Sequence, residues 1–317
     1  MNVPTKTGLI YSNEYLNHVT PSGHPESPRR AEVVMKALDD AGLASRMDRL
    51  QPRLATEQEI LRCHTQKYFQ TAKSDVQHGL SDLSTGDTNI CEKSFDIALL
   101  AAGGVITAVD TVVQNKARNA FCVVRPPGHH ATPVRGMGFC LFNNIAIGAR
   151  HAQAAHKIGK VLIADWDVHH GNGTQDIFYD DGSVFFFDCH QHPWYPGTGD
   201  ASEIGTGKGL NCIMNNPFPA GSGRKEILGA FETRLVDAAQ KFKPDLVMLS
   251  AGFDSREGDP LGHFTLSDDD FVDLTKVVLH IAREHCEGRL VAVLEGGYNL
   301  RGLMKAAVAH VKTLMGD

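Results

Sequence analysis

The segment "VLIADWDVHHGNG", residues 161–173, joins an apolar run to acidic and imidazole side chains. In an extended segment alternate side chains share a face, so Asp165, Asp167 and His169 are predicted to point the same way. Burying unpaired carboxylates is costly, and a divalent cation is the simplest partner that would neutralise them. The pattern alone leaves an alternative open, in which the aspartates cap a following helix and His169 and His170 are core residues.

The segment "LSAGFDSREGDPLG" repeats this design, because an apolar run ends at a glycine turn and Asp254 follows. Asp254 can therefore supply a third ligand beside Asp167 and His169. One nitrogen and two carboxylate ligands leave coordination positions for water and substrate, which is typical of a catalytic zinc centre rather than a closed structural one. The same ligands suit Fe(II), Co(II) or Mn(II), so the metal used in the cell stays open.

Two further polar groups follow apolar runs. "VVRPPGHH" brings His129 and His130 to a position where they could act as acid and base beside a bound water. Asp165 and Asn172 could accept hydrogen bonds from their ring N–H groups. "LEGGYNL" places Tyr298 after a glycine turn, from which its hydroxyl could donate to a developing oxyanion. Taken alone, each of these groups would be an ordinary loop feature.

The elements that must position these groups are predicted from hydrophobic patterning. Buried parallel strands are indicated by five short apolar runs, namely "AFCVV", "KVLIA", "SVFFF", "DLVMLS" and "RLVAVL". Helices are predicted at 94–116, at 144–158, at 223–242 between Ser222 and Pro244, at 268–287 with Ser267 as N-cap, and from about 300 onward. This alternation predicts an α/β fold with a parallel sheet flanked by helices on both faces. Because no linker or repeat interrupts residues 1–317, we interpret them as a single domain.

The composition excludes several classes of partner. The net charge of −6 and the pI near 6.2 come without clustering of Lys and Arg, so direct nucleic-acid binding is not expected. We find no apolar segment with the length of a signal-peptide core or of a membrane span, and we expect a cytoplasmic protein without membrane contact. The seven cysteines, an odd number with no C-x-x-C pair, fit reduced thiols.

Together these motifs resemble the histone deacetylase and acetylpolyamine amidohydrolase family. The resemblance runs through "GHPESPRR" at 23–30, "RPPGHH", "GFCLFNN", "DWDVHHGNGTQ", "PGTGD", "AGFDSREGDPLG" and "EGGY". It implies an arginase/deacetylase-like α/β fold and zinc-dependent hydrolysis of an N-acetyl amide by one catalytic Zn²⁺. Asn172 stands where class I members have an aspartate, which indicates a class II-like member, and the compact chain indicates a bacterial source.

The resemblance also implies roles for individual side chains. Asp167, His169 and Asp254 match the zinc ligands, His130 matches the general base and acid, and His129 matches a largely electrostatic histidine paired with Asp165. Tyr298 matches the oxyanion donor. The substrate tunnel would take Phe139 and Tyr195 as walls, Gly138 and Gly297 as the residues that keep it passable, Leu261 near the mouth, Asp87 as the rim residue that holds substrate amides, and Arg30 beside an acetate exit path.

The family resemblance implies a structural K⁺ beside the zinc. Asp165 would serve this ion, and Asp188 would add a carboxylate where many relatives have serine. This departure leaves open whether the site binds potassium more tightly or binds another cation.

An apolar tunnel suits acetyl-lysine, in a peptide or as a small molecule, or a similar slim N-acyl amine. Acetylpolyamine is the alternative substrate, although no long insertion narrows the entrance. A non-catalytic metal-binding or interaction module is the alternative of another class, and retention of the tyrosine, both histidines and all three ligands argues against it. A two-manganese ureohydrolase would need further ligands where the chain has His170 and Asn172. Acyl-chain preference and homo-oligomerisation stay open.

Overall fold

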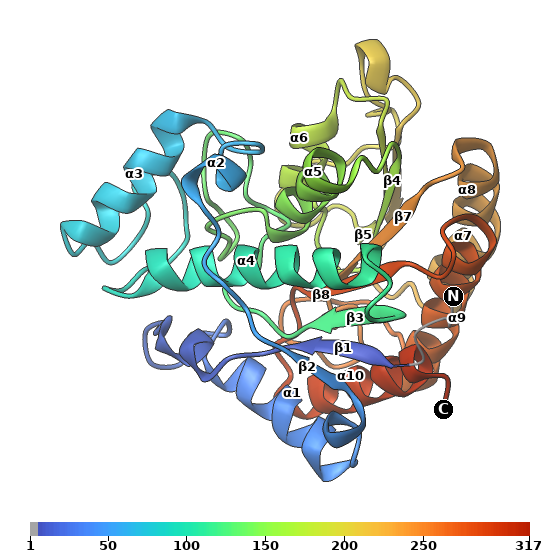
Figure 1. Ribbon diagram of the computed structural model, residues 1–317, viewed down its shortest axis with the longest axis horizontal. Coiled ribbons are helices and arrows are strands. Elements are labelled where there is room, and N and C mark those ends of the chain that lie inside the picture. The colour runs from blue at the N-terminus through green and yellow to red at the C-terminus, as the bar shows by residue number, and fades with distance from the viewer. Residues whose placement is uncertain (1–5) are drawn as a thin grey trace.

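A computed structural model describes residues 6–317 and contains an eight-stranded sheet in which all neighbouring strands are parallel (Figure 1). The strands are β1 (Thr7–Ile10), β2 (Asp48–Leu50), β3 (Asn119–Cys122), β4 (Val161–Asp165), β5 (Val184–Gln191), β6 (Ile213–Phe218), β7 (Leu246–Ala251) and β8 (Leu290–Leu294). Their order across the sheet is β2-β1-β3-β8-β7-β4-β5-β6. The predicted α/β fold with a parallel sheet is confirmed.

The five apolar runs of the sequence correspond to β3, β4, β5, β7 and β8. The remaining strands were not predicted, because they lack the long apolar run of a strand buried on both faces. β2 has only three residues and β6 reads "IMNNPF"; both lie at edges of the sheet, where polar residues and proline are tolerated. β1, "TGLI", is buried but only four residues long.

The helices alternate with the strands along the chain. They are α1 (Arg29–Asp40), α2 (Glu57–Ile60), α3 (Gln66–Gln77), α4 (Ser94–Val113), α5 (Asn144–His156), α6 (Asn172–Phe178), α7 (Arg224–Ala230), α8 (Val236–Phe242), α9 (Asp268–His285) and α10 (Leu300–Met315). Short 3₁₀ turns lie at Asn13–Asn17, Ala44–Arg46 and Gly207–Gly209, and one π-helical turn lies at Phe231–Leu235. Ser267 caps α9 as predicted, since its hydroxyl accepts from the Asp270 N–H.

The predicted continuous helix at 223–242 is wrong in detail. The π turn Phe231–Leu235 divides it into α7 and α8, and its first turn begins at Arg224 rather than directly after Ser222. A π turn inserts one extra residue per turn and shifts the apolar positions, which a 3.6-residue pattern does not anticipate.

The helices form two layers because strand side chains alternate between the faces of the sheet. In β4, Leu162 and Ala164 pack in the core that α1, α9 and α10 cover, whereas Val161 and Ile163 pack in the core that α4 and α5 cover. Figure 1 shows α4 and α5 on one side of the sheet and α1 and α10 on the other. Both faces are therefore covered, as the sequence predicts.

The prediction that no segment could span a membrane needs correction. Helix α4 is 20 residues long, with a mean hydropathy of 1.7 in its most apolar window, and so meets the length and composition of a span. Most of that window, 61%, is buried inside the protein, as expected for a core helix.

The strand register brings four loops to one edge of the sheet. Across the adjacent strands β3, β8, β7 and β4, Cys122 pairs with Val293, Val293 with Ser250, and Ser250 with Asp165. The loops that follow these strands therefore leave the sheet at the same level, at its carboxyl edge, where open α/β sheets bind ligands.

Candidate active site

Three side chains with metal-binding atoms meet beyond the ends of β4 and β7. Asp167, His169 and Asp254 each offer one ligand atom, and these atoms all lie within 4.8 Å of one another. His169 Nδ1 lies 3.0 Å from Asp167 Oδ1 and 3.2 Å from Asp254 Oδ2. All three residues are buried. The structure thus brings together the residues that the sequence proposes as metal ligands.

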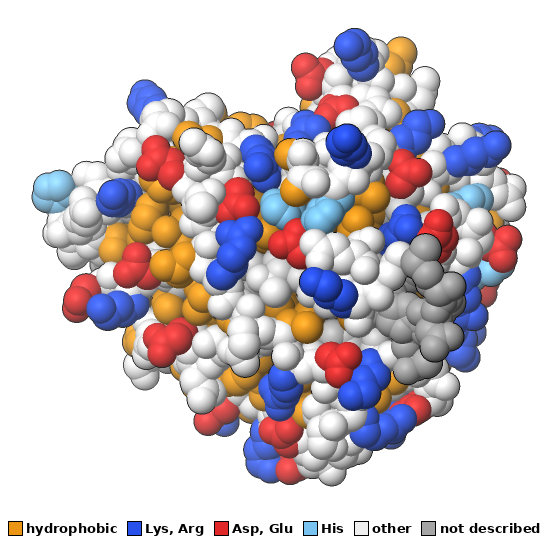
Figure 2. Space-filling model, viewed as in Figure 1, with side chains coloured by type: hydrophobic (Ala, Val, Ile, Leu, Met, Phe, Trp, Pro, Cys, Tyr) orange, Lys and Arg blue, Asp and Glu red, His pale blue; other side chains and the backbone are white. Residues whose placement is uncertain are grey.

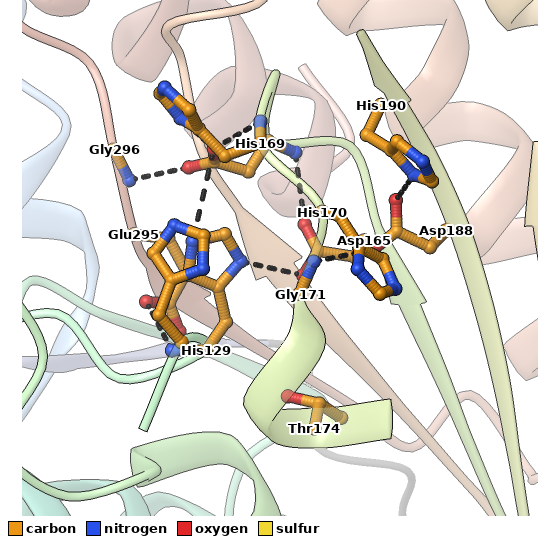
Figure 3. Close-up of polar contacts among 12 residues, drawn as sticks. His129, Asp165, His169, His170, Gly171, Thr174, Asp188, His190, Glu295 and Gly296 are labelled. Carbon is orange, nitrogen blue, oxygen red and sulfur yellow. Dashed lines mark hydrogen bonds and ion pairs between the residues drawn. The ribbon is translucent and has the colours of Figure 1, made fainter. Parts of the chain in front are cut away.

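The chain after β4 keeps its alternation of side chains although the strand itself ends at Asp165. Trp166 and Val168 are fully buried in the core, and Asp167 between them points the other way, toward the ligand group. The backbone turns because Asp167 N donates to Asp165 Oδ1 over 3.0 Å and His169 N donates to Asp167 Oδ1 over 2.9 Å (Figure 3). These side-chain contacts hold the segment together with backbone hydrogen bonds from Trp166 N to Ser250 O of β7 and from Gln191 N of β5 to Val168 O.

Two features of the ligand side chains fit a bound divalent cation. Asp254 Oδ2 is buried and accepts no hydrogen bond within residues 6–317, since His169 Nδ1, 3.2 Å away, is directed at Asp167 Oδ1. Burial together with the charge of Asp167 raises the pKa of Asp254 to about 7. Glycines make room for the carboxylates, because a Cβ on Gly252 would collide with Asp167 Oδ2 and a Cβ on Gly296 with Asp254 Oδ2. Asp254 Oδ1 already accepts from Val168 N over 2.9 Å, and a cation would supply the partner that Oδ2 lacks.

Two histidines stand beside this group, each with an orienting partner. His129 Nδ1 lies 3.0 Å from Asp165 Oδ2, and His130 Nδ1 lies 2.8 Å from Asn172 Oδ1, with the two ring centroids 4.0 Å apart. Since a carboxylate or amide oxygen accepts, Nδ1 carries the proton in both rings. Nε2 of His130 is then left with a lone pair beside the ligand group.

Neighbouring charges shift the pKa values of the two imidazoles in opposite directions. Burial disfavours the charged form of His129, but Asp167 and Asp165 outweigh it and raise its pKa well above 6.5. Burial lowers the pKa of His130 well below 6.5, and the charges of His129 and His169 lower it further. The arrangement therefore holds His130 in the neutral form, which can accept a proton.

A buried glutamate that was not singled out in the sequence fixes the backbone of the histidine loop. Glu295 Oε2 accepts from Gly128 N over 2.7 Å and from His129 N over 3.2 Å (Figure 3). Its position directly before the glycine turn "GGY" is the only sequence signal for this role. The loops after β3 and β8 are thereby joined beside the site.

A cavity of about 240 Å³ connects these groups to the surface. Its lining contains Asp87, His130, Gly138, Phe139, His169, Trp194, Tyr195, Leu261 and Tyr298. Phe139 and Tyr298 meet edge to face at 5.9 Å between ring centroids, and Tyr195 meets His130 in the same way at 5.2 Å. Trp194 was missed in the sequence; its Nε1 donates to Leu261 O over 2.9 Å and adds aromatic surface next to Tyr195.

The two glycines assigned to the tunnel are required for different reasons, because different side chains lie next to them. Gly138 has a φ of +55° and lies so close to His130 that a Cβ would collide with the imidazole ring. Gly297 is not in the cavity lining, and this part of the prediction needs correction. Its φ is +120°, and a Cβ would press on Phe253 and Leu303 in the core rather than narrow the tunnel.

Asp87 lies at the cavity and already has protein partners. Its Oδ1 accepts from Gly138 N over 2.7 Å and from the Tyr195 hydroxyl over 3.3 Å. The carboxylate thus holds both sides of the tunnel together, and its Oδ2 is left to accept from a substrate.

The Tyr298 turn is held from two sides. Asp259, another residue missed in the sequence, accepts from Tyr298 N over 2.7 Å and from Asn299 N over 2.9 Å through Oδ2. Arg30 is fully buried outside the cavity lining; its guanidinium carbon lies 4.9 Å from the Tyr298 ring centroid and its Nε donates to Gly297 O over 2.7 Å. Burial raises the pKa of Tyr298 well above 10, so its hydroxyl keeps its proton and can donate.

Asp188 lies opposite Asp165 in the register of β4 and β5. Its Oδ2 accepts from Gly171 N over 2.8 Å, and its Oδ1 lies 2.8 Å from His190 Nδ1 (Figure 3). Both oxygens already have partners, so the extra carboxylate is built into the protein network. Potassium binding beside Asp165 and Asp188 stays a prediction.

Comparisons with known proteins identify relatives of this chain. Residues 24–314 match the family model described as histone deacetylase domain. The chain is 39% identical over 300 residues to a "Probable deacetylase" of Archaeoglobus fulgidus, covering 94% of this chain and 83% of that protein. It is 37% identical over 296 residues to a "Histone deacetylase-like amidohydrolase" of Pseudomonas aeruginosa, covering 93% of this chain and 78% of that protein.

A solved structure shows the same fold. The crystal structure of the HDA15 HD domain superposes with a TM-score of 0.93 at 37% sequence identity, over 98% of this chain and 90% of that chain. The match extends over the sheet, both helix layers and the loops that carry the site. This chain therefore belongs to the histone deacetylase family of hydrolases.

Proposed function

We propose that this protein is a zinc-dependent amidohydrolase that removes acetyl or similar acyl groups from N-acetyl-lysine or another slim N-acylated amine. The observation that carries the proposal is the convergence of Asp167, His169 and Asp254, with an unpartnered buried carboxylate oxygen, at the inner end of the aromatic cavity. A divalent zinc ion held there would supply Lewis-acid polarisation of the amide carbonyl and a water activated for attack.

The histidines handle the protons. Because His130 Nδ1–H donates to Asn172 and the ring is neutral, His130 Nε2 can take the proton of the attacking water and return it to the leaving amine nitrogen. His129, held by Asp165, places an imidazole beside the ligand group and stabilises charge there.

Tyr298 stabilises the oxyanion of the tetrahedral intermediate. Its hydroxyl keeps the proton, and the Asp259 carboxylate fixes the backbone from which the ring projects into the cavity. Removing one oxyanion donor lowers turnover by about a hundredfold to a thousandfold in enzymes of this kind.

The cavity supports the choice of substrate class. Phe139, Tyr195, Trp194 and Leu261 offer apolar surface to a methylene stem, and Asp87 offers an acceptor at the wall for an amide N–H of the substrate. Because charged groups are few along the wall, the cavity favours a stem without charges.

The test is hydrolysis by the purified zinc-loaded protein of an acetyl-lysine peptide, free acetyl-lysine, N-acetylputrescine and N-acetylspermidine, with a chelator-treated sample beside it. The proposal expects the highest kcat/KM on an acetyl-lysine substrate. Preference for the acetylpolyamines would replace the lysine substrate by the alternative one, and absence of hydrolysis on the whole panel would contradict the proposed activity and favour a non-catalytic module.

A matched pair of variants separates chemistry from packing. Tyr298→Phe should lower kcat by about a hundredfold or more. Tyr195→Phe removes a hydroxyl from the same cavity, but this hydroxyl bonds to Asp87 and not to reacting atoms. Tyr195→Phe should therefore change kcat little. Equal activity of the two variants would refute the role of Tyr298.

A further inference from the structure

A second group of metal-binding side chains lies at the ends of α4 and α5, outside the active site. It consists of Asp110 of α4 and His151 and His156 of α5, whose ligand atoms all lie within 4.8 Å of one another. Histidine side chains beside acidic and basic ones are visible over these two helices in Figure 2. This group shares no residue with the catalytic ligands.

The geometry directs both imidazoles at one carboxylate. Nε2 of His151 lies 2.7 Å and Nε2 of His156 lies 2.6 Å from Asp110 Oδ1, with the ring centroids 5.7 Å apart. The side chain of His151 is 8% exposed, that of His156 15% and that of Asp110 34%, so the group is largely enclosed and still reachable from solvent. Two imidazole nitrogens and one carboxylate are a ligand set that zinc favours, with water in the remaining position.

A carboxylate stands behind the more buried histidine. His151 Nδ1 lies 3.5 Å from Glu59 Oε1, and such a carboxylate usually orients the far side of a metal-bound imidazole. Glu59 is itself fixed, because its carboxylate accepts from Arg53 over 2.6 and 2.8 Å and from Thr56 N over 2.8 Å.

The tautomer of His151 can follow the occupancy of the site. Arg62 lies 3.2 Å from the same Nδ1 and donates to it when His151 Nε2 carries the proton toward Asp110. With a metal on Nε2 the proton moves to Nδ1, where Glu59 can accept it. Each tautomer of His151 thus has a partner at Nδ1, Arg62 for one and Glu59 for the other, which an ordinary ion pair between α4 and α5 does not require.

We propose that Asp110, His151 and His156 bind one Zn²⁺ that ties the C-terminal end of α4 to that of α5. This site goes beyond the deacetylase function: the ion would cross-link two helices, with water completing its coordination. It would stabilise α5, whose N-cap Asn143 is held against the active-site loop by hydrogen bonds of Asn143 Nδ2 to Ala131 O and Thr174 Oγ1.

The experiment measures how many zinc ions each chain binds. Metal-free protein is titrated with ZnCl₂ by calorimetry in a buffer that contains Mg²⁺, and wild type is expected to bind two equivalents per chain. Asp254→Asn should lose the catalytic equivalent and keep the other, while His156→Gln should lose the second equivalent and keep its activity. His280→Gln replaces an exposed histidine of α9 and serves as the matched control that keeps both.

Thermal unfolding gives a second measurement. In the Asp254→Asn background, zinc at about a hundredfold over its Kd should raise the unfolding midpoint by on the order of 5 °C, and His156→Gln should abolish this rise. Asp110→Asn repeats the test with a side chain of the same shape in case His156→Gln does not fold. One equivalent in wild type, or two in His156→Gln and Asp110→Asn, would overturn the proposal and leave the deacetylase assignment untouched.

Discussion

Replacing Gly138 by alanine should disable the site through a single added methyl group. Gly138 has a φ of +55°, a conformation that costs a residue with a Cβ about 1–2 kcal/mol. The added Cβ would collide with the His130 ring, lying 2.8 Å from its Cγ, whereas ordinary contacts are 3.4–4 Å. The imidazole must therefore move by on the order of 1 Å, which weakens its 2.8 Å bond to Asn172 and can lower turnover by about a hundredfold.

The matched control is Gly79→Ala. Gly79 has a φ of +69°, but a Cβ there meets no atom within 4 Å. Both variants should lose free energy of unfolding, measured by urea denaturation, because both force alanine into the left-handed region, and Gly138→Ala should lose more because its Cβ also collides with His130. Only Gly138→Ala should lose kcat on the preferred substrate. If the kcat of Gly138→Ala stays within about threefold of that of Gly79→Ala, the contact between Gly138 and His130 does not control the catalytic geometry.

The remaining predictions concern charge. In metal-free protein Asp254→Asn should be at least as stable as wild type, because it removes a buried negative charge whose Oδ2 has no hydrogen bond, while the amide oxygen can still accept from Val168 N. The variant should also lose zinc at the active site, and clear destabilisation in calorimetry would contradict the fit to a cation. Burial lowers the pKa of His64 to about 4 and that of His310 to about 3 from 6.5. Since the unfolded chain takes up these protons first, each histidine should remove about 1.4 kcal/mol of stability per pH unit as the pH falls from about 6 to about 5. His310→Asn should reduce that slope in urea unfolding by one such contribution, and an unchanged slope would refute the buried neutral state.

The fold could be predicted from the sequence where burial on both faces of the sheet leaves a continuous apolar run. This holds for β3, β4, β5, β7 and β8, which lie side by side in the sheet, whereas the inner strand β1 is too short to give such a run. The edge strands β2 and β6 carry polar residues because one of their sides is exposed, so no periodic signal marks them. The π turn at Phe231–Leu235 has no signal either, since it results from packing.

The candidate site, too, could be predicted from the sequence only in part. Residue types that bind metals or move protons, placed directly after apolar runs, are visible in the sequence, and parallel strands deliver them to one edge. Asp259 and Glu295 were missed because each acts on the backbone of another loop, and a carboxylate that accepts from peptide N–H groups looks like any other acidic residue in sequence.

By itself the sequence determined the chemistry at the sheet edge, because Asp167, His169 and Asp254 each follow an apolar run and parallel strands deliver such residues to one edge. Tertiary structure alone decided which glycine limits the tunnel, since Gly138 contacts His130 while Gly297 contacts the core. It also decided that His151 and His156 meet Asp110 across 41 and 46 residues of sequence. Helix packing sets such distances, and packing depends on side chains from the whole domain rather than on any local pattern.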